Sequence, residues 1–150
     1  MRETELTPAE WGRLRKAFAR VPFVHLLGIK LGEAERGAAT LYLDARDELG
    51  RMEGIMHGGV IASLIDTAAA FAVITLLEPL QTTATADLTV HYLRPVLGGQ
   101  IRAHARVLRA GRGLVSVAVE VRSDGEELIA TALTTYVKRG GSDGAPAPEA

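Results

Sequence analysis

One carboxylate, Asp66, stands alone in a long apolar stretch of the chain, residues 58–77. A helix drawn through this stretch is hydrophobic on nearly every face, and such helices are normally buried. Burying an unpaired carboxylate is costly in free energy or shifts its pKa upward. Asp66 is therefore expected to have either a chemical role or a structural partner, such as a salt bridge or a neighbouring loop that it caps.

Two glycines, Gly58 and Gly59, stand where this helix should begin. The first N–H groups of a helix have no acceptor inside it and carry the positive end of the helix dipole. Glycines there let the carbonyl oxygen of a ligand come close to those N–H groups. Asp66 follows Gly59 by two turns, about 10 Å along the axis, on the same face. The spacing thus predicts a carbonyl-polarising helix end and a carboxylate on one side of one helix.

The same stretch is long enough to be weighed as a membrane span. An aspartate at the centre of a span costs about 2.5–3.5 kcal/mol, and the threonines, serine and glycines weaken the case further. We therefore expect a buried helix in a protein that has no membrane partner.

Composition narrows the classes of function. The chain has 150 residues, a formal net charge of −1 and no cysteine. This length predicts one domain, and the lack of basic excess argues against nucleic acid as a partner. Without cysteine, thiol catalysis and disulfides are excluded, and the four scattered histidines have no metal-ligand spacing, so neither a metal nor a cofactor is expected. The charged amino terminus lacks the apolar run of a signal peptide, which predicts a soluble cytoplasmic protein.

Capping residues and hydrophobic periods predict the secondary structure. Thr7, Pro8 and Glu10 form a capping box that begins a short helix, which should stop near Pro22. Two strand-like runs and the polar turn between them are expected to form a hairpin: residues 25–31, 32–37 and 38–43. The apolar helix should end before Pro79, and alternating apolar residues then predict four further strands: residues 83–93, 100–108, 114–122 and 127–138.

An antiparallel sheet with one all-apolar helix packs most simply by curling around that helix. The expected fold class is therefore α+β, with a curved antiparallel sheet around one long central helix. One sheet cannot cover every apolar face of the helix, so a second subunit is expected to cover the rest. Residues 140–150 are small, polar and rich in proline and glycine, and are expected to form a disordered tail.

Two segments together resemble a known family. The segment from His57 to Ala68 has the pattern His-Gly-Gly, six residues, then Asp, and it is followed by the segment from Ala86 to Pro95. Both are similar to segments of the hotdog-fold acyl-CoA thioesterases of the phenylacetate-degradation type. The resemblance covers roughly residues 20–139. It implies a single hotdog domain over residues 1–139, N-terminal helix included, that forms a homodimer or homotetramer.

The resemblance also implies roles for individual residues. Asp66 is the catalytic carboxylate, either as general base on a water or as nucleophile on the thioester carbonyl. The backbone N–H of Gly58, next to the Asp66 of a neighbouring subunit, is the oxyanion donor, with Gly59 beside it in the substrate site. Thr85 matches a Ser or Thr that helps hold the water or nucleophile, and its alternative is an ordinary β-branched strand residue. His57 orients the glycine turn, hydrogen-bonds the region of the substrate carbonyl, or is a structural loop residue.

The residues expected to bind substrate depart in part from the family. Arg51 occupies a position where many members carry Asn or Gln, and an arginine cannot accept a hydrogen bond. Either another residue takes over that contact or Arg51 turns to a phosphate. The CoA phosphates would be held by Arg112, Lys138 and Arg139, where the family tends to place such contacts, although scattered surface arginines are the simpler alternative.

The leading hypothesis is hydrolysis of an acyl-CoA thioester to a free acid and CoA, with CoA as part of the substrate and no other cofactor. The acyl half of the pocket would be apolar and could be lined by Leu64 and Phe71.

Two other functions are weighed against it. A non-catalytic hotdog protein that binds acyl-CoA or an aromatic ligand is slightly favoured by Arg51, and is opposed by the joint presence of Asp66, Gly58 and Thr85. A hotdog dehydratase would need a histidine paired with a carboxylate on the long helix, and His57 precedes that helix.

Overall fold

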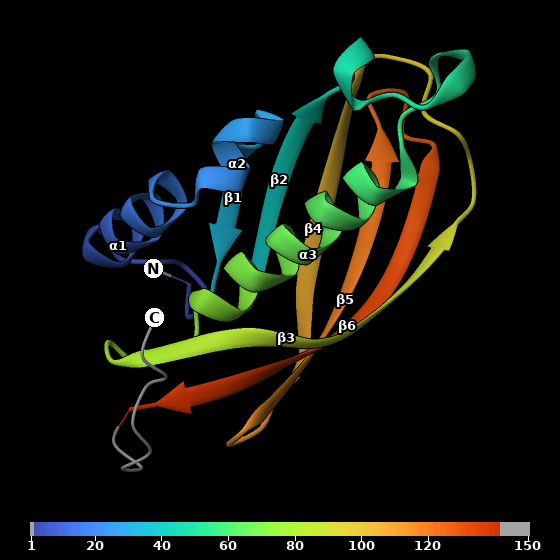
Figure 1. Ribbon diagram of the computed structural model, residues 1–150. Coiled ribbons are helices and arrows are strands. Elements are labelled where there is room, and N and C mark those ends of the chain that lie inside the picture. The colour runs from blue at the N-terminus through green and yellow to red at the C-terminus, as the bar shows by residue number, and fades with distance from the viewer. Residues whose placement is uncertain (1, 142–150) are drawn as a thin grey trace.

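A six-stranded antiparallel sheet curls around one long helix in the computed structural model, which describes residues 2–141 (Figure 1). The sheet order is β1-β2-β4-β5-β6-β3. In chain order, the helices and strands are α1 Pro8–Ala19, α2 Pro22–Leu27, β1 Lys30–Glu35, β2 Ala38–Asp44, α3 Gly58–Ile74, β3 Gln81–Tyr92, β4 Gln100–Ala110, β5 Leu114–Ser123 and β6 Leu128–Gly140. Two short 3-10 turns, Asp47–Leu49 and Met52–Gly54, precede α3. From residue 142 on, the predicted tail lies outside the described residues.

Strand β3 lies at an edge of the sheet, although it comes in the middle of the chain. It pairs with the last strand, β6, and its other side has no strand partner among the described residues. The register places Thr85 directly opposite Tyr136. Side chains of directly opposed residues point to the same face of a sheet, so these two side chains both face α3.

Helix α3 crosses the concave face of the sheet, as Figure 1 shows, and supplies the centre of the core. Leu64, Ile65 and Ala68 are fully buried against sheet residues such as Leu41 and Val117. The prediction of a buried central helix is thus confirmed. The helix ends at Ile74, four residues before the predicted limit, and no helix within residues 2–141 is both long and apolar enough to cross a membrane.

Helix α1 begins with the predicted capping box. The Thr7 side chain accepts a hydrogen bond from the Glu10 N–H, and the Glu10 carboxylate accepts one from the Thr7 N–H. The helix ends at Ala19, close to the predicted stop.

The strand predicted over residues 25–31 is wrong. These residues begin inside α2 and reach β1 only at Lys30. Pro22 occupies the first turn of α2, and Gly28 ends it in the left-handed conformation with φ of 76°. Proline in the first turn and glycine just past the end are typical of a helix. These two residues therefore decide that this short apolar run is helical. The four later strands agree with their predicted limits to within two residues at each end.

Candidate active site

Three elements meet at the carboxylate of Asp66. The residue projects from the middle of α3 and is half-buried. Its Oδ1 accepts a hydrogen bond of 2.8 Å from the Thr85 hydroxyl on β3 and one of 2.5 Å from the Tyr136 phenol on β6. No donor within residues 2–141 reaches Oδ2. One carboxylate oxygen is therefore anchored, and the other is available for chemistry.

Tyr136 is the site residue that sequence reasoning missed. Its side chain is only 1% exposed. Burial, with the Asp66 carboxylate beside it, raises the pKa of Tyr136 well above its usual range, so the phenol stays a hydrogen-bond donor. The phenol oxygen also lies 2.5 Å from the backbone carbonyl oxygen of Asp66. The sequence could have indicated Tyr136, because it follows Ala132 and Thr134 at every second position on the inward face of the last strand. A buried tyrosine hydroxyl usually needs a hydrogen-bond partner.

The glycine turn at the start of α3 is built around His57. The Nδ1 atom of His57 accepts a 2.8 Å hydrogen bond from the Gly59 N–H, which makes His57 the N-cap of the helix. In the neutral ring the proton is therefore on Nε2. A Cβ at Gly59 would lie 2.9 Å from that Nδ1, which is too close. The geometry favours the interpretation that His57 orients the turn.

Gly58 is the first residue of α3, and no acceptor for its N–H is found within residues 2–141. Its carbonyl oxygen accepts a 2.8 Å hydrogen bond from the Tyr92 hydroxyl. Both residues line a pocket of about 430 Å³ together with Arg51 and Arg94. The structure thus brings Arg51 to the helix end and adds a second arginine, Arg94, that the sequence did not single out.

The structure does not bring Gly58 and Asp66 of one chain together. They are eight residues apart on the same helix, about 12 Å along its axis. Both groups would need to lie about 3 Å from the atoms of one thioester to act on it. Within a single chain the two halves of the predicted site are therefore separate.

The residues predicted to hold the CoA phosphates lie at the other end of β3 from Tyr92. Lys138 and Arg139 are opposite Thr83 and Thr82, and the Lys138 N–H donates to the Gly113 carbonyl in the turn that contains Arg112. Arg112 and Arg139 are exposed. The turn and the end of β6 are thus neighbours, and the phosphate role stays a prediction.

The acyl-pocket residues were placed wrongly. Leu64 is fully buried, and Phe71 is 3% exposed with its ring 5.2 Å from that of Phe18 in an edge-on contact. Both belong to the core because they project from the face of α3 that packs on the sheet and on α1, away from Asp66.

Comparison with known proteins identifies the family of this chain. Residues 53–130 match the thioesterase superfamily. The chain belongs to this superfamily. The medium/long-chain acyl-CoA thioesterase YigI of Salmonella typhimurium is 32% identical over 132 residues, covering 78% of this chain and 85% of the relative.

Solved structures of this thioesterase class share the fold. A thioesterase family protein of Silicibacter pomeroyi aligns with a TM-score of 0.83 and 27% identity, over 88% of this chain and 99% of that chain. The PaaI protein of the Escherichia coli phenylacetic acid degradation operon aligns with a TM-score of 0.82 at 22% identity, over 88% and 94% of the two chains, and supports the fold alone. The predicted hotdog fold and the predicted enzyme class, a thioester hydrolase, are confirmed.

The thioesterase match includes most of the candidate site. His57, the glycine pair, Asp66 and Thr85 all lie within residues 53–130, whereas Tyr136 lies beyond them. The roles of these residues stay predictions, which the geometry makes specific.

Proposed function

We propose that this protein hydrolyses acyl-CoA thioesters to a free acid and CoA, with Asp66 as the reactive carboxylate. The observation that carries the proposal is the asymmetry of this carboxylate. Oδ1 accepts hydrogen bonds from Thr85 and Tyr136, while Oδ2 has no protein donor within the described residues. A carboxylate held in this way is oriented without being neutralised, which is what a general base or a nucleophile needs.

Two routes use the free Oδ2 atom. As a general base, it removes a proton from a water whose oxygen attacks the thioester carbonyl carbon, and the C–S bond then breaks to release CoA thiolate, which takes up the proton. As a nucleophile, it attacks that carbon itself, CoA thiolate leaves, and water hydrolyses the mixed anhydride. In a single turnover in ¹⁸O-labelled water, label in Asp66 identifies the nucleophilic route, in which water attacks the aspartyl carbonyl of the anhydride.

A second copy of the chain supplies the oxyanion donor in this proposal. The distance along α3 keeps Gly58 and Asp66 of one chain from sharing a thioester. Strand β3 has no strand partner on its outer side within the described residues, and the unpaired N–H and C=O groups of such an edge can pair with another chain. When two copies pair their β3 strands about a two-fold axis, the two strands run antiparallel. Thr85, near the start of one β3, then lies towards the end of the partner's β3.

One register fits both halves of the site. Directly opposed residues share a face, and both Thr85 and Tyr92 point to the α3 side. When Thr85 lies opposite the partner's Tyr92, Asp66 lies beside the partner's Gly58. The reason is that Asp66 is hydrogen-bonded to Thr85, and Gly58 is hydrogen-bonded to Tyr92. The pocket lined by Arg51 and Arg94 at that helix end then adjoins the thioester.

Cysteine cross-linking tests this register. The chain has no cysteine, and a variant carrying both Thr85→Cys and Tyr92→Cys should form a disulfide-linked dimer under mild oxidation. The two positions are about 23 Å apart within one strand, too far for an internal disulfide. Each single variant is the control. A monomer by light scattering at micromolar concentration would contradict the shared site.

The finer assignments belong to this proposal too. YigI is a medium/long-chain acyl-CoA thioesterase, which favours a linear acyl group, and membership of the phenylacetate-degradation type follows the sequence resemblance. Association into a homodimer or homotetramer, a cytoplasmic location and the use of no cofactor beyond the CoA of the substrate follow the sequence predictions.

Thiol release from a panel of acyl-CoAs tests the function itself. The panel should include linear chains of several lengths and an aromatic acyl group. Hydrolysis of any member well above the spontaneous rate supports the enzyme. The non-catalytic alternative predicts binding of an acyl-CoA in calorimetry with no thiol release, and that result would overturn the proposal.

A further inference from the structure

A path of half-buried positions leads along α3 away from Asp66. Ser63, Asp66, Ala70 and Ile74 are half-buried and follow one another at three- and four-residue spacing, which puts them on one face of the helix. Between Asp66 and Ile74, the half-buried side chains of α3 are those of Thr67 and Ala70, which are both small and uncharged. A chain attached to a thioester at Asp66 could therefore lie along this face without meeting a bulky or charged group of α3.

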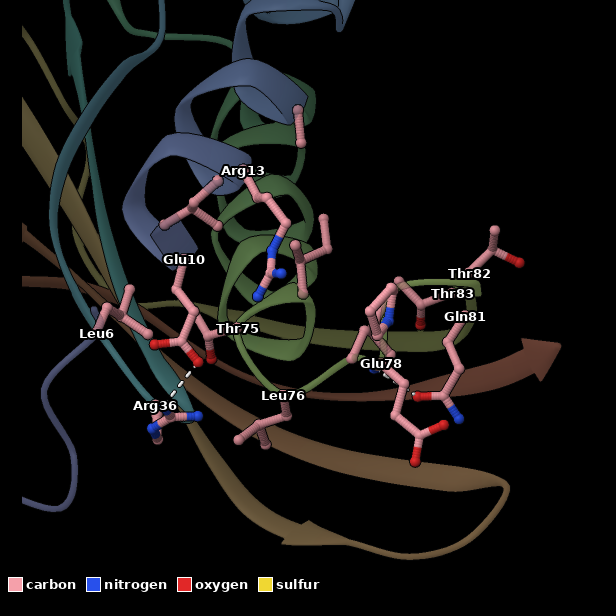
Figure 2. A pocket seen from close by; sticks show the side chains of 15 residues that line it. Leu6, Glu10, Arg13, Arg36, Thr75, Leu76, Glu78, Gln81, Thr82 and Thr83 are labelled. Carbon is pink, nitrogen blue, oxygen red and sulfur yellow. Dashed lines mark hydrogen bonds and ion pairs between the residues drawn. The ribbon is translucent and has the colours of Figure 1, made fainter. Parts of the chain in front are cut away.

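The path ends in a pocket between α1 and the end of α3, which Figure 2 shows from close by. The pocket has a volume of about 470 Å³. Its floor is mainly apolar: Leu6, Leu14, Ala17, Ile74, Leu76 and Leu77. Thr83 lines it from β3, two residues before Thr85. The pocket thus adjoins the helix and the strand that build the Asp66 site.

Several polar side chains around this pocket are hydrogen-bonded or ion-paired within the protein. The Thr75 hydroxyl donates to a backbone carbonyl of α3 at 2.6 Å, and the Thr83 hydroxyl donates to one of β6 at 3.0 Å. Glu10 forms a 2.6 Å ion pair with Arg36, marked in Figure 2. The surface that a ligand would contact is mostly apolar, and the pocket therefore suits a hydrocarbon group.

We propose that this pocket holds the distal end of a linear acyl chain whose thioester lies at Asp66, and that its size sets the chain-length preference. The inference rests on the proposed thioesterase function. Asp66 and Ile74 are about 12 Å apart along the helix axis. An extended alkyl chain advances roughly 1.3 Å per carbon, from C–C bonds of about 1.5 Å, so about nine carbons span that distance. A hexanoyl chain ends before the pocket, and a dodecanoyl chain enters it.

Filling the pocket from the α1 side tests this assignment. Ala17→Phe adds a ring where the cavity has room, at a distance from Asp66. Each buried methylene contributes roughly a factor of four in affinity. Displacing a few methylenes should lower the ratio of kcat/KM for dodecanoyl-CoA to that for hexanoyl-CoA at least ten-fold, with the hexanoyl value unchanged. The control is Ala9→Phe, the same change at an exposed position of α1 outside the pocket.

A second variant, which enlarges the pocket and does not fill it, keeps the test decisive if Ala17→Phe lowers the melting temperature. Leu77→Ala enlarges the pocket and should shift the preference from dodecanoyl-CoA towards tetradecanoyl-CoA. An unchanged chain-length profile in a folded variant overturns the pocket assignment while thiol release continues to support the thioesterase.

Failure of the proposed function gives a different result. The wild-type protein would then release thiol from no acyl-CoA in the panel. In that case calorimetry with dodecanoate decides the pocket alone. Binding that is lost in Ala17→Phe and kept in Ala9→Phe supports an apolar-chain site, and binding that is absent or equal in both variants overturns it.

Discussion

The Tyr136 phenol donates a hydrogen bond to Oδ1 of Asp66 from a strand seventy residues further along the chain. Thr85 donates to the same oxygen from the strand paired with it. The carboxylate is therefore oriented by two side chains that lie opposite each other in the sheet, and its other oxygen has no donor within the described residues. This relationship makes the contributions of the three residues separable by mutation.

Asp66→Asn should abolish activity and leave the fold intact. The amide keeps the shape and an oxygen that can accept from Thr85 and Tyr136, but it is neither a base nor a nucleophile. Turnover of the best acyl-CoA should fall at least ~100-fold, while the melting temperature is unchanged or higher because a neutral amide is easier to bury. Thiol release and thermal denaturation on the same preparation check this. Unchanged turnover per folded molecule would exclude Asp66 as the reactive group.

Tyr136→Phe should act on catalysis through the position of Asp66. The variant fills the same space but withdraws one of the two donors to Oδ1, so we expect kcat to fall roughly ten-fold with KM little changed. Leaving a buried acceptor with one donor fewer costs about 1–3 kcal/mol of stability. Steady-state kinetics and urea denaturation measure the two effects. Thr85→Val is the matched variant for the other donor, and a loss of activity in either that only follows the unfolded fraction, with kcat per folded molecule unchanged, would argue for a purely structural role.

Two substitutions of His57 separate capping from substrate contact. His57→Ala removes the acceptor for the Gly59 N–H and should cost about 1 kcal/mol, as lost N-caps do. His57→Asn restores a good capping side chain and should restore both stability and activity if the histidine only orients the turn. Thermal denaturation and kcat are the readouts. Restored stability with activity still lost would instead assign the Nε2 side of the ring to the substrate.

The capping carboxylate of α1 predicts a pH dependence of stability. Hydrogen bonds from the Thr7 backbone and side chain, with Arg36 nearby, lower the pKa of Glu10 from its usual 4.5. A lowered folded pKa gives a contribution that is present above pH 4.5 and is lost as the pH falls through the folded value. Glu10→Ala should therefore lower Tm by a few degrees at neutral pH, and the gap should close in acid. Glu3→Ala, at an exposed position without such contacts, should show no gap at either pH.

The sequence was sufficient for features that depend on local signals. The capping box of α1, the buried α3 and the limits of the four long strands follow from residue type and spacing within each segment. Residues 25–31 were misjudged because a short apolar run fits a strand or a helix equally well. Pro22 and Gly28 were the better guide there.

The parts of the site that escaped prediction depend on pairing between distant segments. Thr85 was matched to a family position, but its neighbour Tyr136 was not predicted, because only the sheet order puts β3 beside β6. Tyr136 has no special spacing from Asp66 in the sequence, and its role becomes visible only when the register sets it opposite Thr85. Leu64 and Phe71 failed for a related reason, since the periodicity of α3 did not say which of its apolar faces the sheet covers.

The position of β3 at the sheet edge also governs when the site can form during synthesis. Strand β3 pairs with residues 128–140 and not with β4, the next strand made. While the C-terminal strand is still inside the ribosome, β3 has no strand partner and Asp66 lacks the Tyr136 phenol. Contacts between such distant segments form late because the intervening loop must close first. The carboxylate therefore acquires its working geometry only after β6 has been made and has paired with β3, and a chain cut short before residue 136 cannot assemble it.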